Sequence, residues 1–124
     1  MIAVDTSSLI SFIAGEVGRD VFLIDKAMED GLLILPPPVI SEMLSDIDFP
    51  IQHEALLKRL PTLSEKEGFW ERTGLLRKSV LKMKLKARLA DALICQYCLD
   101  YNLPLITRDA DFNNFAKVSK LVLF

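Results

Sequence analysis

Short apolar runs without polar alternation recur along the chain, and segments with helical spacing separate them. The runs that predict buried strands are 2–4, 32–35, 103–107 and 120–124. The predicted helices are 6–14, 20–30, one that begins at the triple proline 36–38, 51–60, one that follows 64–67, 86–101 and a short one at 111–115. Strands that are apolar throughout are buried on both faces, so we predict a three-layer α/β/α sandwich. Its sheet is expected to be mainly parallel, with four to five strands, in a single domain of residues 1–124.

Local signals predict where several of these helices begin. The hydroxyls of Thr6, Ser7 and Ser8 are candidate N-caps for the first helix. Ser64 followed three residues later by Glu67 forms a capping-box pattern. Glu42 is expected in an early turn of the helix after the prolines, where the helix dipole favours a carboxylate.

Composition narrows the class of protein. Hydrophobic residues make up 51% of the 124 residues, which leaves apolar surface for a dimer or another partner. No apolar stretch approaches the roughly 20 residues of a membrane span. A candidate functional aspartate at position 5 leaves no room for a signal peptide. We therefore expect a soluble, cytoplasmic protein.

The number of cysteines and histidines excludes a zinc site built from four of them, and the spacing of the cysteines raises the question of a redox pair. Two cysteines and one histidine are too few for a zinc site with four such ligands. Cys95 and Cys98 form a C-x-x-C pattern, but they lie inside an apolar helical run and not at the start of a helix after a strand. Buried helical cysteines are therefore favoured over a redox pair.

Charge is distributed unevenly between the two halves of the chain. Residues 1–71 hold 13 acids and 5 bases, whereas residues 72–124 hold 4 acids and 10 bases. Seven of those bases and no acid fall between positions 72 and 90. The segment is either a solvated helix face or a surface for an anionic partner.

Four acids stand in apolar sequence at the ends of predicted elements: Asp5, Glu42, Asp91 and Asp109. A buried carboxylate needs a partner or a metal. Asp5 and Asp109 each follow a predicted strand, at the edge where open α/β sheets bind their ligands. Asp91 is expected to project from a helix toward the same edge.

Converging carboxylates repel one another and raise each other's pKa unless cations are present. All-oxygen ligands without histidine or cysteine suit Mg²⁺ or Mn²⁺, which can activate water for phosphodiester hydrolysis. The hydroxyls of Thr6, Ser7 and Thr107 are expected to orient the carboxylates or metal-bound waters. Arg108 is expected to pair with Asp109 or to contact a phosphate.

The acids lie in four motifs whose order and spacing are similar to those of the PIN-domain nucleases, in particular the VapC-type toxins. The motifs are Ile-Ala-Val-Asp-Thr-Ser at 2–7, Val-Ile-Ser-Glu-Met-Leu at 39–44, Leu-Ala-Asp-Ala-Leu-Ile at 89–94 and Leu-Ile-Thr-Arg-Asp-Ala-Asp-Phe at 105–112. The resemblance covers essentially the whole chain and depends on the ordered set. The bulky residues 94–98 and the triple proline depart from the family's usual pattern.

The resemblance implies a metal-dependent endoribonuclease that uses Mg²⁺ or Mn²⁺. Its catalytic and metal-binding acids would be Asp5, Glu42, Asp91 and Asp109, with Thr6, Ser7, Thr107 and Asp111 in support. It further implies a homodimer and an antitoxin partner. RNA phosphates would follow the basic segment, with contacts expected from Lys82, Lys84, Lys86, Arg88 and Arg108.

Two other classes of function compete with this one. A PIN-like module that binds RNA or protein without cutting is an alternative, although it has no evident need for clustered charges. The second is another kind of phosphotransfer enzyme, but the chain lacks the motifs of such enzymes. Position 7 is Ser, where a haloacid-dehalogenase-like phosphatase has Asp. The chain also has no Gly-Lys-Ser or Gly-Lys-Thr turn.

Overall fold

Three short parallel strands form the centre of the protein in the order β2–β1–β3. The structure is a computed structural model that describes all 124 residues. β1 (Ile2–Val4) pairs with β2 (Leu33–Ile34) on one side and with β3 (Leu105–Ile106) on the other. The chain adds strands to both sides of β1, so the carboxyl ends of β1 and β3 meet where the strand order reverses.

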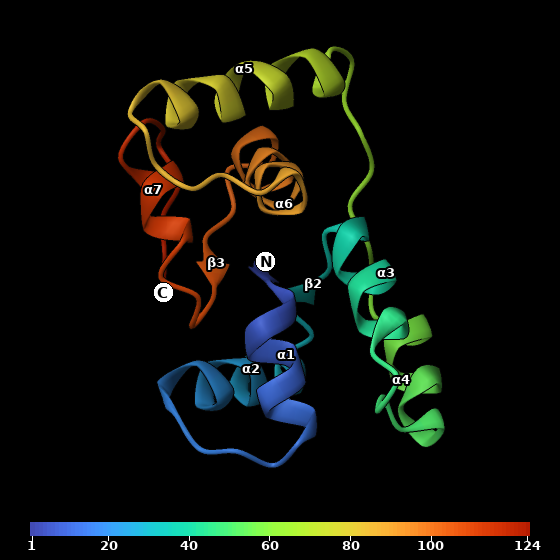
Figure 1. Ribbon diagram of the computed structural model, residues 1–124. Coiled ribbons are helices and arrows are strands. Elements are labelled where there is room, and N and C mark those ends of the chain that lie inside the picture. Colours follow the sequence, from blue (N-terminus) through green and yellow to red (C-terminus); the bar gives the residue numbers. More distant parts are fainter.

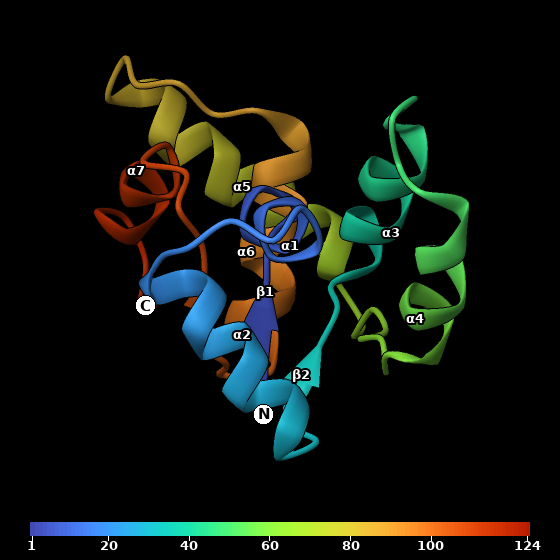
Figure 2. The same cartoon turned by 90° about the horizontal axis from the view of Figure 1, so that it is seen from below.

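Helices cover both faces of this sheet. They are α1 (Thr6–Ile13), α2 (Arg19–Glu29), α3 (Pro37–Ser45), α4 (Glu54–Arg59), α5 (Phe69–Lys82), α6 (Leu89–Asp100) and α7 (Phe112–Ala116), with a 3₁₀ turn at Ile51–His53. Figure 1 shows α2 on one side of the strands and α5 and α6 on the other. In Figure 2, α3 and α4 lie beyond β2. The predicted α/β sandwich is confirmed.

The sheet is smaller than the four to five strands expected. Outside the three strands there are only two isolated parallel bridges, Leu35 to Thr62 and Leu105 to Leu123. The first cannot grow because Pro36, which has no N–H, directly follows Leu35 and caps α3. The second does not grow because the chain leaves β3 after Ile106 to form the acidic loop 107–111.

The first helix begins differently from the expectation. Its N-cap is Asp5, whose carboxylate accepts a hydrogen bond from the Ser8 N–H at 3.1 Å. The hydroxyls of residues 6–8 therefore do not cap it. This correction matters for function, because one hydrogen bond both starts α1 and orients a candidate metal ligand.

Three other local expectations are also wrong. The fifth helix begins after Gly68, whose φ of 78° is left-handed, so Ser64 and Glu67 do not form a capping box. The sixth begins at Leu89 and not at 86, because the backbone of Arg88 is extended, with a ψ of 146°. Glu42 lies in the second turn of α3, beyond the first turn where the helix dipole acts.

The core fills the space between the sheet and its helices. The strand side chains of Ala3, Val4, Leu105 and Ile106 are fully enclosed. Cys95 and Cys98 are free and buried on α6, as expected, and burial raises the pKa of the Cys98 thiol to about 12. No helix combines the length and the apolar character that a membrane crossing requires.

Candidate metal centre

Asp5 stands at the carboxyl end of β1 and is held there by three donors. Its carboxylate accepts hydrogen bonds from the Ser8 N–H, from Ser7 Oγ at 2.9 Å and from Thr107 Oγ1 at 2.7 Å. Burial raises the pKa of Asp5, and the three hydrogen bonds act in the opposite direction. The residue is only 3% exposed. Asp5 is therefore fixed in both position and orientation.

Thr107 joins the ends of the two neighbouring strands. Its hydroxyl donates to Asp5 Oδ2 at 2.7 Å and accepts from the Asp109 N–H at 3.0 Å. One side chain thus orients the carboxylate after β1 and shapes the loop after β3.

We expect Thr107→Val to weaken the binding of a divalent cation by about 10- to 100-fold, as happens when a group that orients a metal ligand is lost. The free energy of unfolding should fall by about 1–3 kcal/mol, because the Asp109 N–H loses its acceptor and Asp5 loses a donor. Thr107→Ser keeps the hydroxyl and is the matched control. Calorimetric titration with Mn²⁺ and urea unfolding of both variants measure the effect, and unchanged Mn²⁺ binding by Thr107→Val would contradict it.

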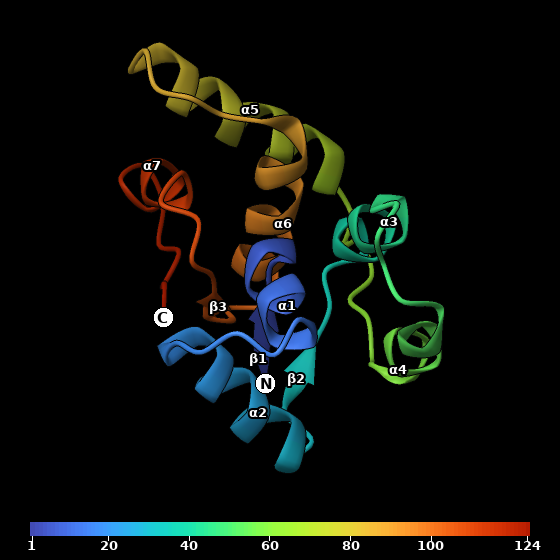
Figure 3. The same ribbon diagram turned by 60° about the horizontal axis from the view of Figure 1, so that its bottom comes forward.

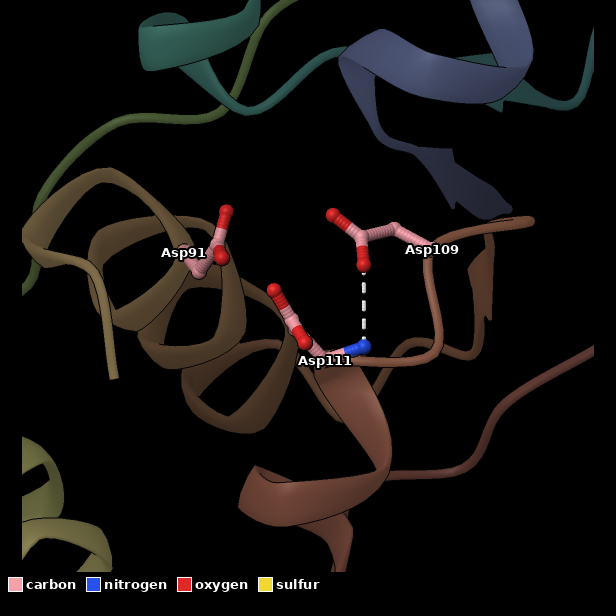
Figure 4. Close-up of side chains that lie close together, drawn as sticks. All are labelled: Asp91, Asp109 and Asp111. Atoms are coloured by element: carbon pink, nitrogen blue, oxygen red, sulfur yellow. Dashed lines mark hydrogen bonds between the residues drawn. The ribbon is translucent and has the colours of Figure 1, made fainter. Parts of the chain in front are cut away.

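Three aspartates come together beside this junction. Asp91, Asp109 and Asp111 each offer a carboxylate oxygen, and the three atoms lie within 4.8 Å of one another. Figure 4 shows Asp91 reaching from α6 toward the two others, which come from the loop between β3 and α7. Asp109 Oδ1 accepts the Asp111 N–H at 2.9 Å, and this bond turns the loop. Asp111, expected only in a supporting position, belongs to the tightest group of acids.

Asp91 is a buried acid whose charge is not offset by hydrogen bonds from the protein. It is 7% exposed, and its Oδ2 is buried without any hydrogen-bond partner. Burial, together with the negative charges of Asp109, Glu42 and Asp5, raises the pKa of Asp91 to about 6, although the positive charge of Arg88 acts in the opposite direction. A buried unpaired oxygen among carboxylates is the donor set that a hard divalent cation requires. These residues therefore fit Mg²⁺ or Mn²⁺.

Glu42 approaches the same region from α3. Its carboxylate is half-buried and accepts a hydrogen bond from Thr6 Oγ1 at 2.7 Å. It acts on Asp91 through its charge and is not part of the tight group of three. The structure thus brings the four acids predicted from the sequence to one edge of the sheet, with Asp111 as a fifth.

Arg108 does not pair with Asp109. Its guanidinium forms a fork on Asp20, with Nε to Oδ2 at 2.7 Å and Nη2 to Oδ1 at 2.9 Å, and also donates to Glu16 at 2.8 Å. This fork lowers the pKa of Asp20 to about 2. Nothing in the local pattern singles out Asp20, since its partner is 88 residues away. The clamp ties α2 to the residue that precedes Asp109.

The basic segment borders the acids, and several of its cations are already bound. Arg72 pairs with Asp100, Arg77 donates to the Ala87 carbonyl, and Lys86 Nζ lies 3.1 Å from Asp111 Oδ2. Three further cations, Lys82, Lys84 and Arg88, are exposed and form no ion pair. They lie at the end of α5 and in the segment that leads into α6 and Asp91.

A family profile described as "PIN domain" matches residues 2–118, nearly the whole chain. The chain belongs to the PIN-domain family. The parallel sheet flanked by helices is thus the fold of a PIN domain, as the sequence predicted.

Solved structures share the fold of this PIN domain. VapBC2 from Rickettsia felis, bound to a DNA fragment from its promoter, matches with a TM-score of 0.76 at 17% identity, over 100% of this chain and 98% of the other. VapBC-1 from nontypeable Haemophilus influenzae gives 0.75 and 18%, over 100% and 97%. VapBC-5 from Mycobacterium tuberculosis, described as a member of a family of toxin–antitoxin systems, gives 0.68 and 18%, over 99% and 96%. A search of curated proteins found no match.

Proposed function

We propose that this chain, as a single domain of residues 1–124, is a metal-dependent endoribonuclease that hydrolyses RNA phosphodiester bonds. The observation that carries the proposal is the buried, unpartnered Oδ2 of Asp91 beside Asp109 and Asp111. A protein keeps such an oxygen at a cost in stability, and a cation is the partner that the surrounding carboxylates can share. Membership of the PIN-domain family and the fold of VapBC proteins support the same conclusion.

The proposed ligands are Asp5, Glu42, Asp91 and Asp109, to which the geometry adds Asp111. Bound Mg²⁺ or Mn²⁺ would supply charge at the scissile phosphate and make a water more acidic. The chain itself does the positioning: Ser7, Ser8 and Thr107 fix Asp5, and Thr6 fixes Glu42. Asp91 Oδ2 has no such donor, and a bound cation would be its partner.

RNA is the proposed substrate, with its phosphates along the basic segment beside the acids. Lys82, Lys84 and Arg88 are exposed and free of ion pairs, and Lys86 stands next to Asp111. Such contacts hold a strand without reading its sequence. Arg108 is also a candidate for a phosphate contact, but its three hydrogen bonds to Asp20 and Glu16 favour a role in holding the loop.

The biological setting is a proposal that rests on the same likeness. We infer that the protein is the toxin of a toxin–antitoxin pair, with an antitoxin as its protein partner. We further propose that the protein forms a homodimer and acts in the cytoplasm. Exposed apolar side chains such as Val17, Ile47 and Ile51 offer surface for such contacts.

Cleavage of a pool of RNAs by the wild type and by Asp5→Asn, with and without Mn²⁺, tests the function. We expect cleavage only by the wild type and only with the metal, because the substituted amide keeps the shape of the side chain but has no charge to contribute. Circular dichroism establishes that both proteins are folded. A folded wild type that cuts none of the RNAs in Mg²⁺ or Mn²⁺ would refute the proposal.

A further inference from the structure

A groove of about 400 Å³ lies beside the acids, and the proposed chemistry uses none of its lining residues except Glu42. Glu42 belongs to both the groove and the acidic site, and Ala90 and Leu93 line it from either side of Asp91 on α6. Trp70, the second residue of α5, also lines the groove. The start of α5 lies on the side of α6 that faces α3 (Figure 3). The volume is within the roughly 300–1,000 Å³ of small-ligand sites.

Trp70 is an exposed aromatic side chain on a rigid support. It is 62% exposed, although Phe69 next to it is buried. Phe69 contacts Trp70 edge to face, with ring centroids 5.2 Å apart, and lies 4.4 Å from the ring of Tyr97. The indole is therefore held by buried aromatic neighbours while most of its surface remains open, which is the arrangement of a stacking platform.

The charges of the groove select among the parts of a nucleic acid. Of its two carboxylates, Glu42 is a proposed metal ligand, whereas Glu65 is not; no lysine or arginine lines the groove to offset the charge of Glu65. A phosphate would be repelled there. A nucleobase is neutral, stacks on an indole, and carries N–H groups that carboxylates accept. The groove thus complements a base, whereas the cations of residues 82–88 complement phosphates.

We propose that this groove binds an unpaired nucleobase of the RNA, stacked on Trp70, next to the phosphate held at the acids. The position of that phosphate rests on the proposed function. A base in a duplex is paired and stacked and cannot enter, so the groove makes the protein selective for single-stranded RNA. Trp70 is in this view a residue that determines specificity and takes no part in the chemistry.

Trp70 is the only tryptophan of the chain, so its fluorescence reports directly on the groove. The full-length Asp91→Asn protein, which should not cut, would be titrated with a fluorescently labelled single-stranded 12-mer RNA. Anisotropy of the label measures binding, and we expect tryptophan emission to be quenched in parallel. The same backbone with abasic sugars should bind without quenching. Saturable binding of the normal RNA with unchanged tryptophan emission would overturn the proposal.

A matched pair of variants separates stacking from general surface effects. Leu75 lies on the same helix with the same 62% exposure as Trp70 but does not line the groove. We expect Trp70→Ala to weaken RNA binding about tenfold. Trp70→Phe should weaken it less, and Leu75→Ala should leave it unchanged. Equal effects of Trp70→Ala and Leu75→Ala would overturn the proposal.

Two further outcomes distinguish this inference from the proposed function and from a protein interface. A wild type that shows quenching but never cuts RNA would refute the nuclease and support the groove. Quenching by a copurified partner protein, with none by RNA, would make the groove a protein interface and overturn its assignment to a base.

Discussion

Asp91→Asn is expected to abolish RNA cleavage and, at the same time, to stabilise the metal-free protein. Activity should fall by about 10³-fold or more, because several kcal/mol of charge stabilisation depends on the cation that Asp91 helps to hold. At pH 7 the buried carboxylate of Asp91 is ionised at a cost that a neutral amide does not carry. The amide introduced by the substitution can also donate to the neighbouring carboxylates of Asp109 and Asp111.

The gain in stability has a limited size. The pKa of Asp91 is about 6 against an ordinary 3.8, a shift that corresponds to about 3 kcal/mol against the ionised form. Burying the polar amide also costs free energy, so we expect the free energy of unfolding to rise by only about 1–2 kcal/mol. Urea unfolding of metal-free protein at pH 7 measures it. Asp25→Asn, an exposed acid on α2, is the control and should change neither quantity. Loss of stability together with loss of cleavage would show that Asp91 is structural.

Mn²⁺ is expected to stabilise the wild type strongly at pH 7 and weakly at pH 5. The folded Asp91 carboxyl has its pKa raised to about 6 from 3.8, so between these values the folded state holds a proton that the unfolded state has lost. The metal-free protein therefore loses stability as the pH rises from about 4 to 6. A cation binds only the ionised carboxylates, so its effect increases over the same range.

Mass action sets the size of the metal effect. At 100 times its dissociation constant, Mn²⁺ should add about 2.7 kcal/mol to the free energy of unfolding at pH 7. Thermal unfolding at both pH values, with Mn²⁺ or with a chelator, measures it for the wild type and for Asp91→Asn. An equal shift in both proteins would mean that the ion binds elsewhere, and no shift in the wild type would remove the metal site from the proposal.

The positions of the acids could be predicted because sequence pattern reports burial and strand ends well. Asp5 follows an apolar run that forms β1, and Asp91 is the only charge in an apolar helical stretch. Parallel strands bring their carboxyl ends to one edge. These two facts were sufficient to bring residues from four segments together without any knowledge of the contacts.

The contacts themselves could not be predicted, because they depend on single hydrogen bonds within loops. Asp111 joins Asp91 because its own N–H binds the Asp109 carboxylate and turns the chain. The Arg108–Asp20 pair connects residues 88 positions apart, a separation that no periodicity reveals.

The number of strands in the sheet and the first residues of the helices also could not be predicted from the sequence pattern. Apolar content shows that residues 103–107 are buried in part, but not which of them pair, and only Leu105 and Ile106 lie in β3. Several polar residues were candidate N-caps of α1, and Asp5 is the one whose side chain accepts a hydrogen bond from a backbone N–H of the helix. Apolar pattern and capping signals depend on a few residues that are close in sequence, whereas strand pairing depends on the tertiary structure as a whole.

The bond between Thr107 and Asp5 spans 102 residues, and this has a consequence for synthesis. A growing polypeptide emerges from the ribosome with Asp5 first, while β3 and its three site residues Thr107, Asp109 and Asp111 follow only after about a hundred more have been added. Until then β1 has no neighbour on that side, and the site lacks every residue that follows β3. A protein with the proposed activity would therefore lack its assembled site during most of its own synthesis.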